Sequence, residues 1–181
     1  PSAGELVSAL EKFDQKMSML EGNGEDDGFS KELAEATKEA SNIYRALNGG
    51  VSLTAEQTNE LRALQSAVKM ATDSEGLQKA MEALRGAAEE ILAGADELSV
   101  DRYRLIRYML VCMRQVEELG YGVNELDVMI RNVQNVADTE ELYVLYEEFE
   151  HFVEMITDGK LLTECLTLSS KCDNSAEFIL K

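Results

Sequence analysis

Three groups of residues in this chain have types and spacings that could support chemistry. The first is the acidic segment 23–28, Asn-Gly-Glu-Asp-Asp-Gly, which places carboxylates before a glycine at the sixth position, as a calcium-binding loop does. Such a loop needs a bidentate glutamate at position twelve and an apolar residue at position eight, where this sequence has Ala34 and Ser30. We therefore interpret residues 21–28, which are rich in glycine and acidic residues, as a flexible, solvated loop.

The second group is Glu148 and His151, which match the Glu-x-x-His motif of helical bundles with a di-iron centre. Those centres need two such pairs and two further glutamates, and this chain has a single histidine. The apolar spacing Leu145, Phe149, Val153 marks the side of the helix that faces the core. The carboxylates and the histidine then fall on the opposite side: Glu147, Glu150, His151 and Glu154. We expect no metal site here.

The third group is the cysteines, Cys112, Cys165 and Cys172, which with His151 could form a Cys₃His zinc set. No Cys-x-x-Cys spacing supports such a site, and Cys112 lies beside the apolar stripe of its helix, so we interpret it as a small buried apolar residue. Cys165 and Cys172 are seven residues apart, about 10 Å along a helix, which is too far for a disulfide. An odd number of cysteines predicts reduced thiols in the cytoplasm.

Nucleophilic and phosphate chemistry find no motif either. The single histidine has no matched serine or cysteine motif, and no Gly-Lys-Ser/Thr follows the glycine pair 49–50, which we interpret as a helix stop. We therefore predict no catalytic residue, no metal and no cofactor, and a protein that is not an enzyme. An enzyme assembled from scattered carboxylates is the last alternative.

The elements that position these residues are predicted to be helices throughout. Proline occurs only at Pro1, and apolar residues recur at alternating spacings of three and four, while no long stretch alternates with period two. The longest strongly apolar run, residues 108–113, is far shorter than the roughly 20 residues of a membrane span. The first residues lack a basic region followed by an apolar stretch, so we expect no secretion signal.

These patterns predict an all-α antiparallel bundle of about eight helices. Thr54 with Gln57 forms a capping box, Asp73 or Ser74 begins the next helix, and residues 138–141 form another box. The other expected helix caps are Ser30, Asn124, and either Ser99 or Asp101. The expected helices cover residues 6–20, 30–47, 55–71, 74–91, 101–119, 124–136, 139–157, 160–170 and 175–180.

The two halves of the chain differ in composition, which predicts two sections. Sixteen alanines fall in residues 1–98 and only two after them, whereas eight of the eleven tyrosines and phenylalanines fall in residues 99–181. We predict an alanine-rich section, 1–98, and a section richer in aromatic residues, 99–181. They form either two stacked sub-bundles or one elongated bundle.

Charge is the strongest compositional signal. The net charge of −18 disfavours direct binding to nucleic acids and to anionic membranes, both of which attract lysine and arginine. A basic protein partner, metal cations or plain solubility remain open.

Two surface features are candidate binding sites for a partner. The helix expected over residues 138–154 carries seven carboxylates and no lysine or arginine, and it is either a solvated face or a docking ridge that includes Glu147, Glu150 and Glu154. The second feature is the set Arg104, Arg107 and Arg114, expected on one helix face opposite the core stripe. These arginines either pair with neighbouring acidic helices or anchor an interface.

The resulting hypothesis is a non-enzymatic, acidic helical protein-binding module of the cytoplasm. It would act as an adaptor, an inhibitor or immunity factor, or an assembly chaperone for a protein with a basic surface. One alternative is a structural subunit of a larger assembly, such as a virion or secretion component, which would self-associate. Another is an inhibitor that mimics DNA with rows of carboxylates.

Overall fold

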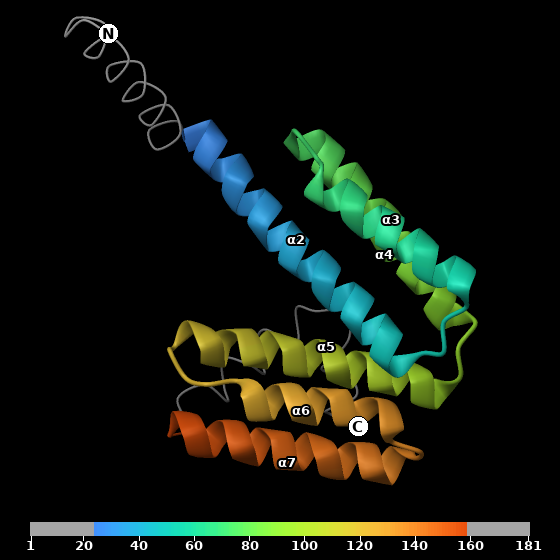
Figure 1. The fold of residues 1–181 in the computed structure, drawn as a ribbon, viewed down its shortest axis with the longest axis vertical. Coiled ribbons are helices and arrows are strands. Elements are labelled where there is room, and N and C mark those ends of the chain that lie inside the picture. The colour runs from blue at the N-terminus through green and yellow to red at the C-terminus, as the bar shows by residue number, and fades with distance from the viewer. Residues whose placement is uncertain (1–23, 159–181) are drawn as a thin grey trace, which may run out of the picture.

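The computed structural model describes residues 24–158, which form six α-helices and one short 3₁₀ helix and contain no strand (Figure 1). The elements are α2 (Gly24–Gly50), α3 (Ala55–Lys69), α4 (Ser74–Ala93), α5 (Glu97–Glu118), α6 (Asn124–Asn132), η1 (Val133–Asn135) and α7 (Thr139–Thr157). The all-α class is therefore confirmed. The helices expected over residues 6–20, 160–170 and 175–180 lie outside the described residues, so the count of about eight stays a prediction. Within 24–158 no helix is both long and apolar enough to cross a bilayer.

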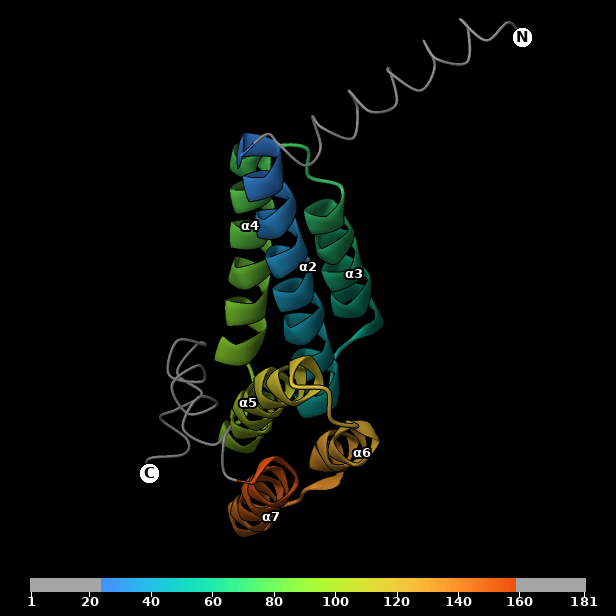
Figure 2. The same ribbon diagram turned by 90° about the vertical axis from the view of Figure 1, so that its left-hand side faces the viewer.

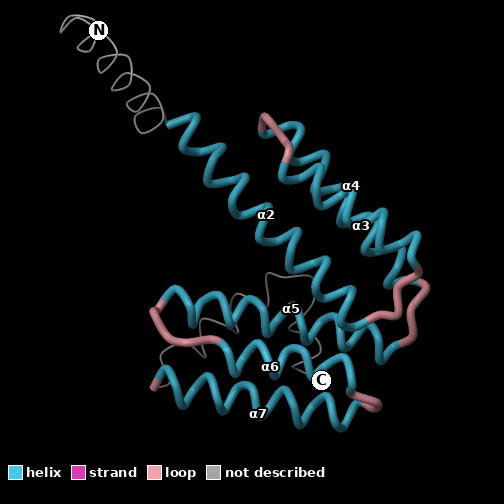
Figure 3. The backbone as a smooth tube through the Cα atoms, in the orientation of Figure 1, coloured by secondary structure: helices cyan, strands magenta, loops and turns pink. Residues whose placement is uncertain are grey.

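The described helices form two layers that cross one another. Helices α2, α3 and α4 lie side by side, and the chain reverses direction at each loop between them (Figures 1 and 3). Helices α5, α6 and α7 form the second layer, which is seen nearly end-on when the first layer stands upright (Figure 2). The loop from α4 to α5 falls at residues 94–96, beside the change of composition, and α2 packs on α5 across the two layers.

Side chains cap three helices where the sequence predicts it. Thr54 Oγ1 accepts from the backbone N–H of Gln57 at 3.1 Å, and the Gln57 side chain accepts from the backbone N–H of Thr54 at 3.0 Å, so the capping box is confirmed. Asp73 caps α4, and Asp138 caps α7 by accepting from the backbone N–H of Glu141 at 2.8 Å. These caps satisfy backbone donors that a helix start leaves without partners.

Three predicted helix starts are wrong. The cap of α5 is Asp96, which accepts from the backbone N–H of Ser99 at 2.7 Å, so this helix begins before both Ser99 and Asp101. Helix α6 begins at Asn124 itself, with no side-chain cap. Ser30 lies inside α2, which already includes residues 24–28 of the predicted loop. Acidic residues are favourable in the first turn of a helix, and each glycine there costs only about 1 kcal/mol.

The apolar stripes form one continuous core. It contains, among others, Ile43 and Leu47 of α2, Leu61 of α3, Leu84 of α4, Ile130 of α6, and Phe149 of α7. Helix α5 lies at its centre, between α2 on one side and α6 and α7 on the other (Figure 2). Its residues 105–110 are all buried, whereas the sequence predicts a single buried stripe, because α5 is covered on more than one face.

The two layers approach one another closely at the end of α2. A Cβ atom on Gly50 would lie 2.6 Å from the backbone nitrogen of Tyr103, and one on Gly49 would lie 2.9 Å from Ile106 Cδ1. Arg102 stabilises this contact between the layers. Its Nε donates to the carbonyl of Gly50 and its Nη1 donates to the carbonyl of Val136, both at 2.9 Å. The glycine pair does end α2, and it also lets two backbones meet.

We predict that Gly50→Ala lowers the free energy of unfolding by about 2 kcal/mol or more, because the added methyl group meets backbone atoms that a side-chain rotation cannot move. The matched control is Gly86→Ala within α4, where nothing lies within 4 Å of an added Cβ. This control should raise the stability by roughly 0.5–1 kcal/mol through helix propensity. Chemical denaturation measures both values, and equal effects of the two variants would contradict the close backbone approach.

Candidate functional site

Two of the three arginines considered as interface anchors form ion pairs within the chain. Arg114 Nη2 lies 2.6 Å from Glu35 Oε1 of α2, and its Nε lies 3.2 Å from Glu118 Oε1. The hydrogen bond from Arg114 lowers the pKa of Glu35. Arg104 lies 3.7 Å from Asp101, one turn earlier on α5. These contacts favour the alternative of intramolecular pairing.

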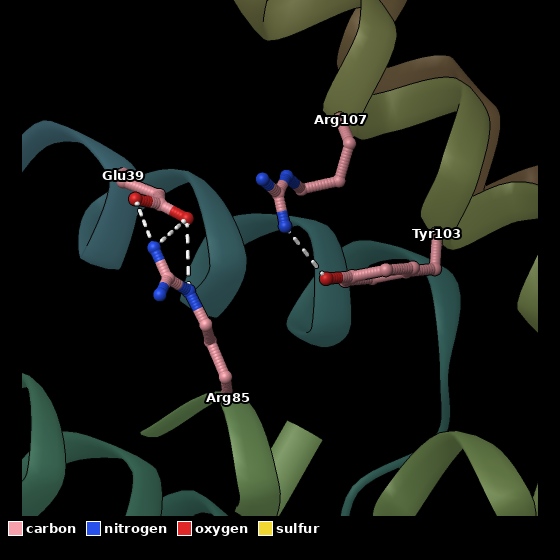
Figure 4. Close-up of polar contacts among 4 residues, drawn as sticks. All are labelled: Glu39, Arg85, Tyr103 and Arg107. Atoms are coloured by element: carbon pink, nitrogen blue, oxygen red, sulfur yellow. Dashed lines mark hydrogen bonds and ion pairs between the residues drawn. The ribbon is translucent and has the colours of Figure 1, made fainter. Parts of the chain in front are cut away.

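Arg107 is 2% exposed, so the prediction that it lies opposite the core stripe is wrong. Its Nη1 donates to the hydroxyl of Tyr103 at 2.9 Å, and its guanidinium lies 5.9 Å from the centre of the Tyr103 ring (Figure 4). The same view shows Arg85 of α4 reaching Glu39 of α2 through two nitrogens. Helix α2 packs on α5, and α4 packs on α2 beside it, which the spacing within α5 alone does not reveal.

A groove of about 970 Å³ lies between α2, α4 and α5. Its walls carry three arginines and five glutamates: Arg85, Arg107, Arg114, Glu32, Glu35, Glu39, Glu82 and Glu118. Arg85 and Arg114 each pair with a glutamate of α2 across this groove. We interpret it as a seam between helices that these ion pairs stabilise.

Helix α7 differs from this seam because none of its carboxylates takes part in an ion pair among residues 24–158. Five of its glutamates are exposed, and the side chains of four of them make no hydrogen bond with another described residue: Glu140, Glu147, Glu148 and Glu154. The fifth, Glu141, accepts from the backbone N–H of Ala137. His151 lies among them and is exposed too. Large apolar side chains share this surface: Tyr143 is 44% exposed, Val144 51% and Met155 58%. We call this surface, residues 140–155 on the exposed side of α7, the outward face.

Glu150 is not part of the outward face, contrary to the prediction. Its side chain is half-buried and accepts hydrogen bonds from the hydroxyls of Tyr108, at 3.0 Å, and Tyr146. The rings of these tyrosines lie 5.7 Å apart between their centres. Glu150 lies on a side of α7 that faces α5. Its partner Tyr108 belongs to α5 and precedes it by 42 residues in the sequence. Spacing within one helix carries no signal for such a contact.

Both tyrosine hydroxyls are held in their protonated form. Burial is the main cause that raises the pKa of Tyr108, and the neighbouring Cys112 and Glu150 add to it. Burial also raises the pKa of Tyr146, followed by its hydrogen bond to Glu150. The neutral hydroxyls can therefore keep donating to the Glu150 carboxylate.

We predict that the protein loses stability as the pH rises above about 10, the ordinary pKa of tyrosine. The folded state keeps two protons that the unfolded state releases, so their stabilisation is complete below this pH and is lost above it. The measurement is the free energy of unfolding against pH, with Tyr108→Phe/Tyr146→Phe beside the wild type. The double variant should show a shallower alkaline decline. A decline as steep as that of the wild type would contradict the assignment, and Tyr121→Phe at an exposed position is the control.

The remaining candidates from the sequence are the cysteines and a metal site. The predicted burial of Cys112 is confirmed, while Cys165 and Cys172 lie outside the described residues. Residues 24–158 contain no group of three or more histidine, cysteine or acidic side chains arranged to hold a metal ion.

Comparison of the chain with protein-family models, with curated proteins and with solved structures finds no match.

Proposed function

We propose that this chain is a non-enzymatic protein-binding module of the cytoplasm that engages a basic protein partner through the outward face of α7. One observation carries the proposal: exposed apolar side chains alternate there with carboxylates that have no cation within the described chain. Tyrosine and methionine are enriched in protein interfaces, and a surrounding rim of charge selects the partner.

The distribution of ion pairs supports this choice of surface. Several carboxylates on α2, α4, α5 and α6 are paired; Asp127 of α6, for example, contacts both Arg45 and Arg131. On α7, Glu150 lies three residues after Glu147 and four before Glu154, and like charges at such spacings repel by a few tenths of a kcal/mol per pair. A basic partner would relieve that repulsion and would be drawn in by the net charge of −18.

The scaffold behind α7 suits a rigid docking surface. Leu142, Phe149 and Val153 bury the inner side of α7 in the core, so the outward face is presented by a helix that is held along its length. An adaptor, an inhibitor or immunity factor, and an assembly chaperone would all use such a surface in the same way, by burying it against a complementary one.

The test is capture of partners from native cells by the tagged full chain at low salt. We expect a stoichiometric basic protein that is released as the salt concentration rises, because screening weakens attraction between surface charges. Neutralising the outward face with Glu140→Gln/Glu147→Gln/Glu148→Gln/Glu154→Gln should weaken binding of the purified partner by about tenfold or more.

A control with the same loss of charge is Glu56→Gln/Glu60→Gln/Glu89→Gln/Glu90→Gln, on exposed positions of α3 and α4. It should leave the affinity nearly unchanged. Equal weakening by the two variants would show that net charge alone drives binding and would refute the outward face as the site. Recovery of self-assembled particles would support the structural-subunit alternative instead, and a partner that itself binds nucleic acid would support DNA mimicry.

A further inference from the structure

A second groove lies beside the outward face, between η1 and the first half of α7, with a volume of about 460 Å³. Its apolar lining is graded in depth: Val136 is buried, Leu145 is half-buried and Val144 is 51% exposed. Four carboxylates line the same groove: Asp138, Glu140, Glu141 and Glu148. It thus combines an apolar strip with concentrated negative charge.

The four carboxylates differ in their contacts: two bind backbone N–H groups of the chain and two do not. Asp138 accepts from the backbone N–H of Glu141, and the Glu141 side chain accepts from the backbone N–H of Ala137 at 3.0 Å, so both are fixed at the start of α7. Glu140 and Glu148 make no hydrogen bond or ion pair with other described side chains and are exposed. They are eight residues apart, about 12 Å along the helix.

We propose that this groove binds a lysine or arginine side chain of the partner, and this inference rests on the proposed function. Such side chains pair an aliphatic stem with a charged end, and they lay the stem on apolar surface while the charge reaches polar groups. The stem would cover Val144 and Leu145, and the cation would meet Glu148 or Glu140 in charge-assisted hydrogen bonds.

If the groove is the binding site, the side of α7 that lines it contributes more to partner binding than the other exposed side. Glu147 and Glu154 share the outward face with Glu148 but do not line the groove, and Met155 is an exposed apolar residue that does not line it either. If attraction to the acidic surface were all that mattered, carboxylates on both sides of α7 would contribute alike. A built groove predicts unequal contributions.

The test uses a synthetic amphipathic peptide of leucine and lysine as the probe, with the full-length protein at low salt. We expect Glu140→Gln/Glu148→Gln to weaken peptide binding about tenfold, and Glu147→Gln/Glu154→Gln to weaken it less than about threefold. Each double variant removes two charges from the same helix, so net charge cannot explain a difference. Calorimetry gives the affinities, and thermal unfolding checks that each variant is folded.

A second pair of variants tests the apolar strip without changing charge. Val144→Ser should weaken peptide binding severalfold, because the aliphatic stem loses contact surface, whereas Met155→Ser should not. Equal effects within both pairs would overturn the groove and leave a diffuse acidic surface, so the proposed function would survive. A peptide that does not bind the wild type would also overturn the groove, and the partner capture described above judges the proposed function independently.

Discussion

The contact between the end of α2 and the start of α5 brings the two layers together. Glycine at position 50 allows the α2 backbone to lie against the backbone of Tyr103, where a Cβ atom would be only 2.6 Å from a nitrogen. Arg102 then ties the last carbonyl of α2 to the carbonyl of Val136, beyond η1, so one side chain joins three segments. Because α2 occupies one side of α5, helices α6 and α7 pack on another, and α7 keeps an exposed side.

Some charged side chains of the described residues form ion pairs between helices, whereas the carboxylates of α7 form none. Arg85 of α4 binds Glu39 of α2, and Arg114 of α5 binds Glu35 of α2, so both pairs help to hold helices together. Helix α7 has no arginine or lysine of its own and no ion pair to another described helix. Its negative charge is therefore available to a molecule outside the chain, and this makes the outward face a better candidate site than the arginine-lined seam.

Local sequence patterns predict the structural features that depend on residues close together in the sequence. The helical class, the apolar stripes and the capping box of Thr54 all follow from spacings of three and four residues. The positions of Arg107 and Glu150 differ from the prediction because they depend on contacts with other helices: Arg107 is buried on α5, on which α2 packs, and Tyr108 of α5 donates to Glu150. The groove beside α7 likewise combines residues near η1 with residues of α7, and residue spacing within either segment does not show it.

The most direct measurement is chemical labelling of carboxylates on the intact protein, alone and bound to its captured basic partner, with sites located by mass spectrometry. The account predicts that Glu140, Glu147, Glu148 and Glu154 are labelled in the free protein and protected in the complex. Exposed carboxylates of α3 and α4, such as Glu56 and Glu90, should be labelled equally in both. Protection of α3 and α4 with unchanged labelling of α7 would contradict the claim that the outward face is the docking surface.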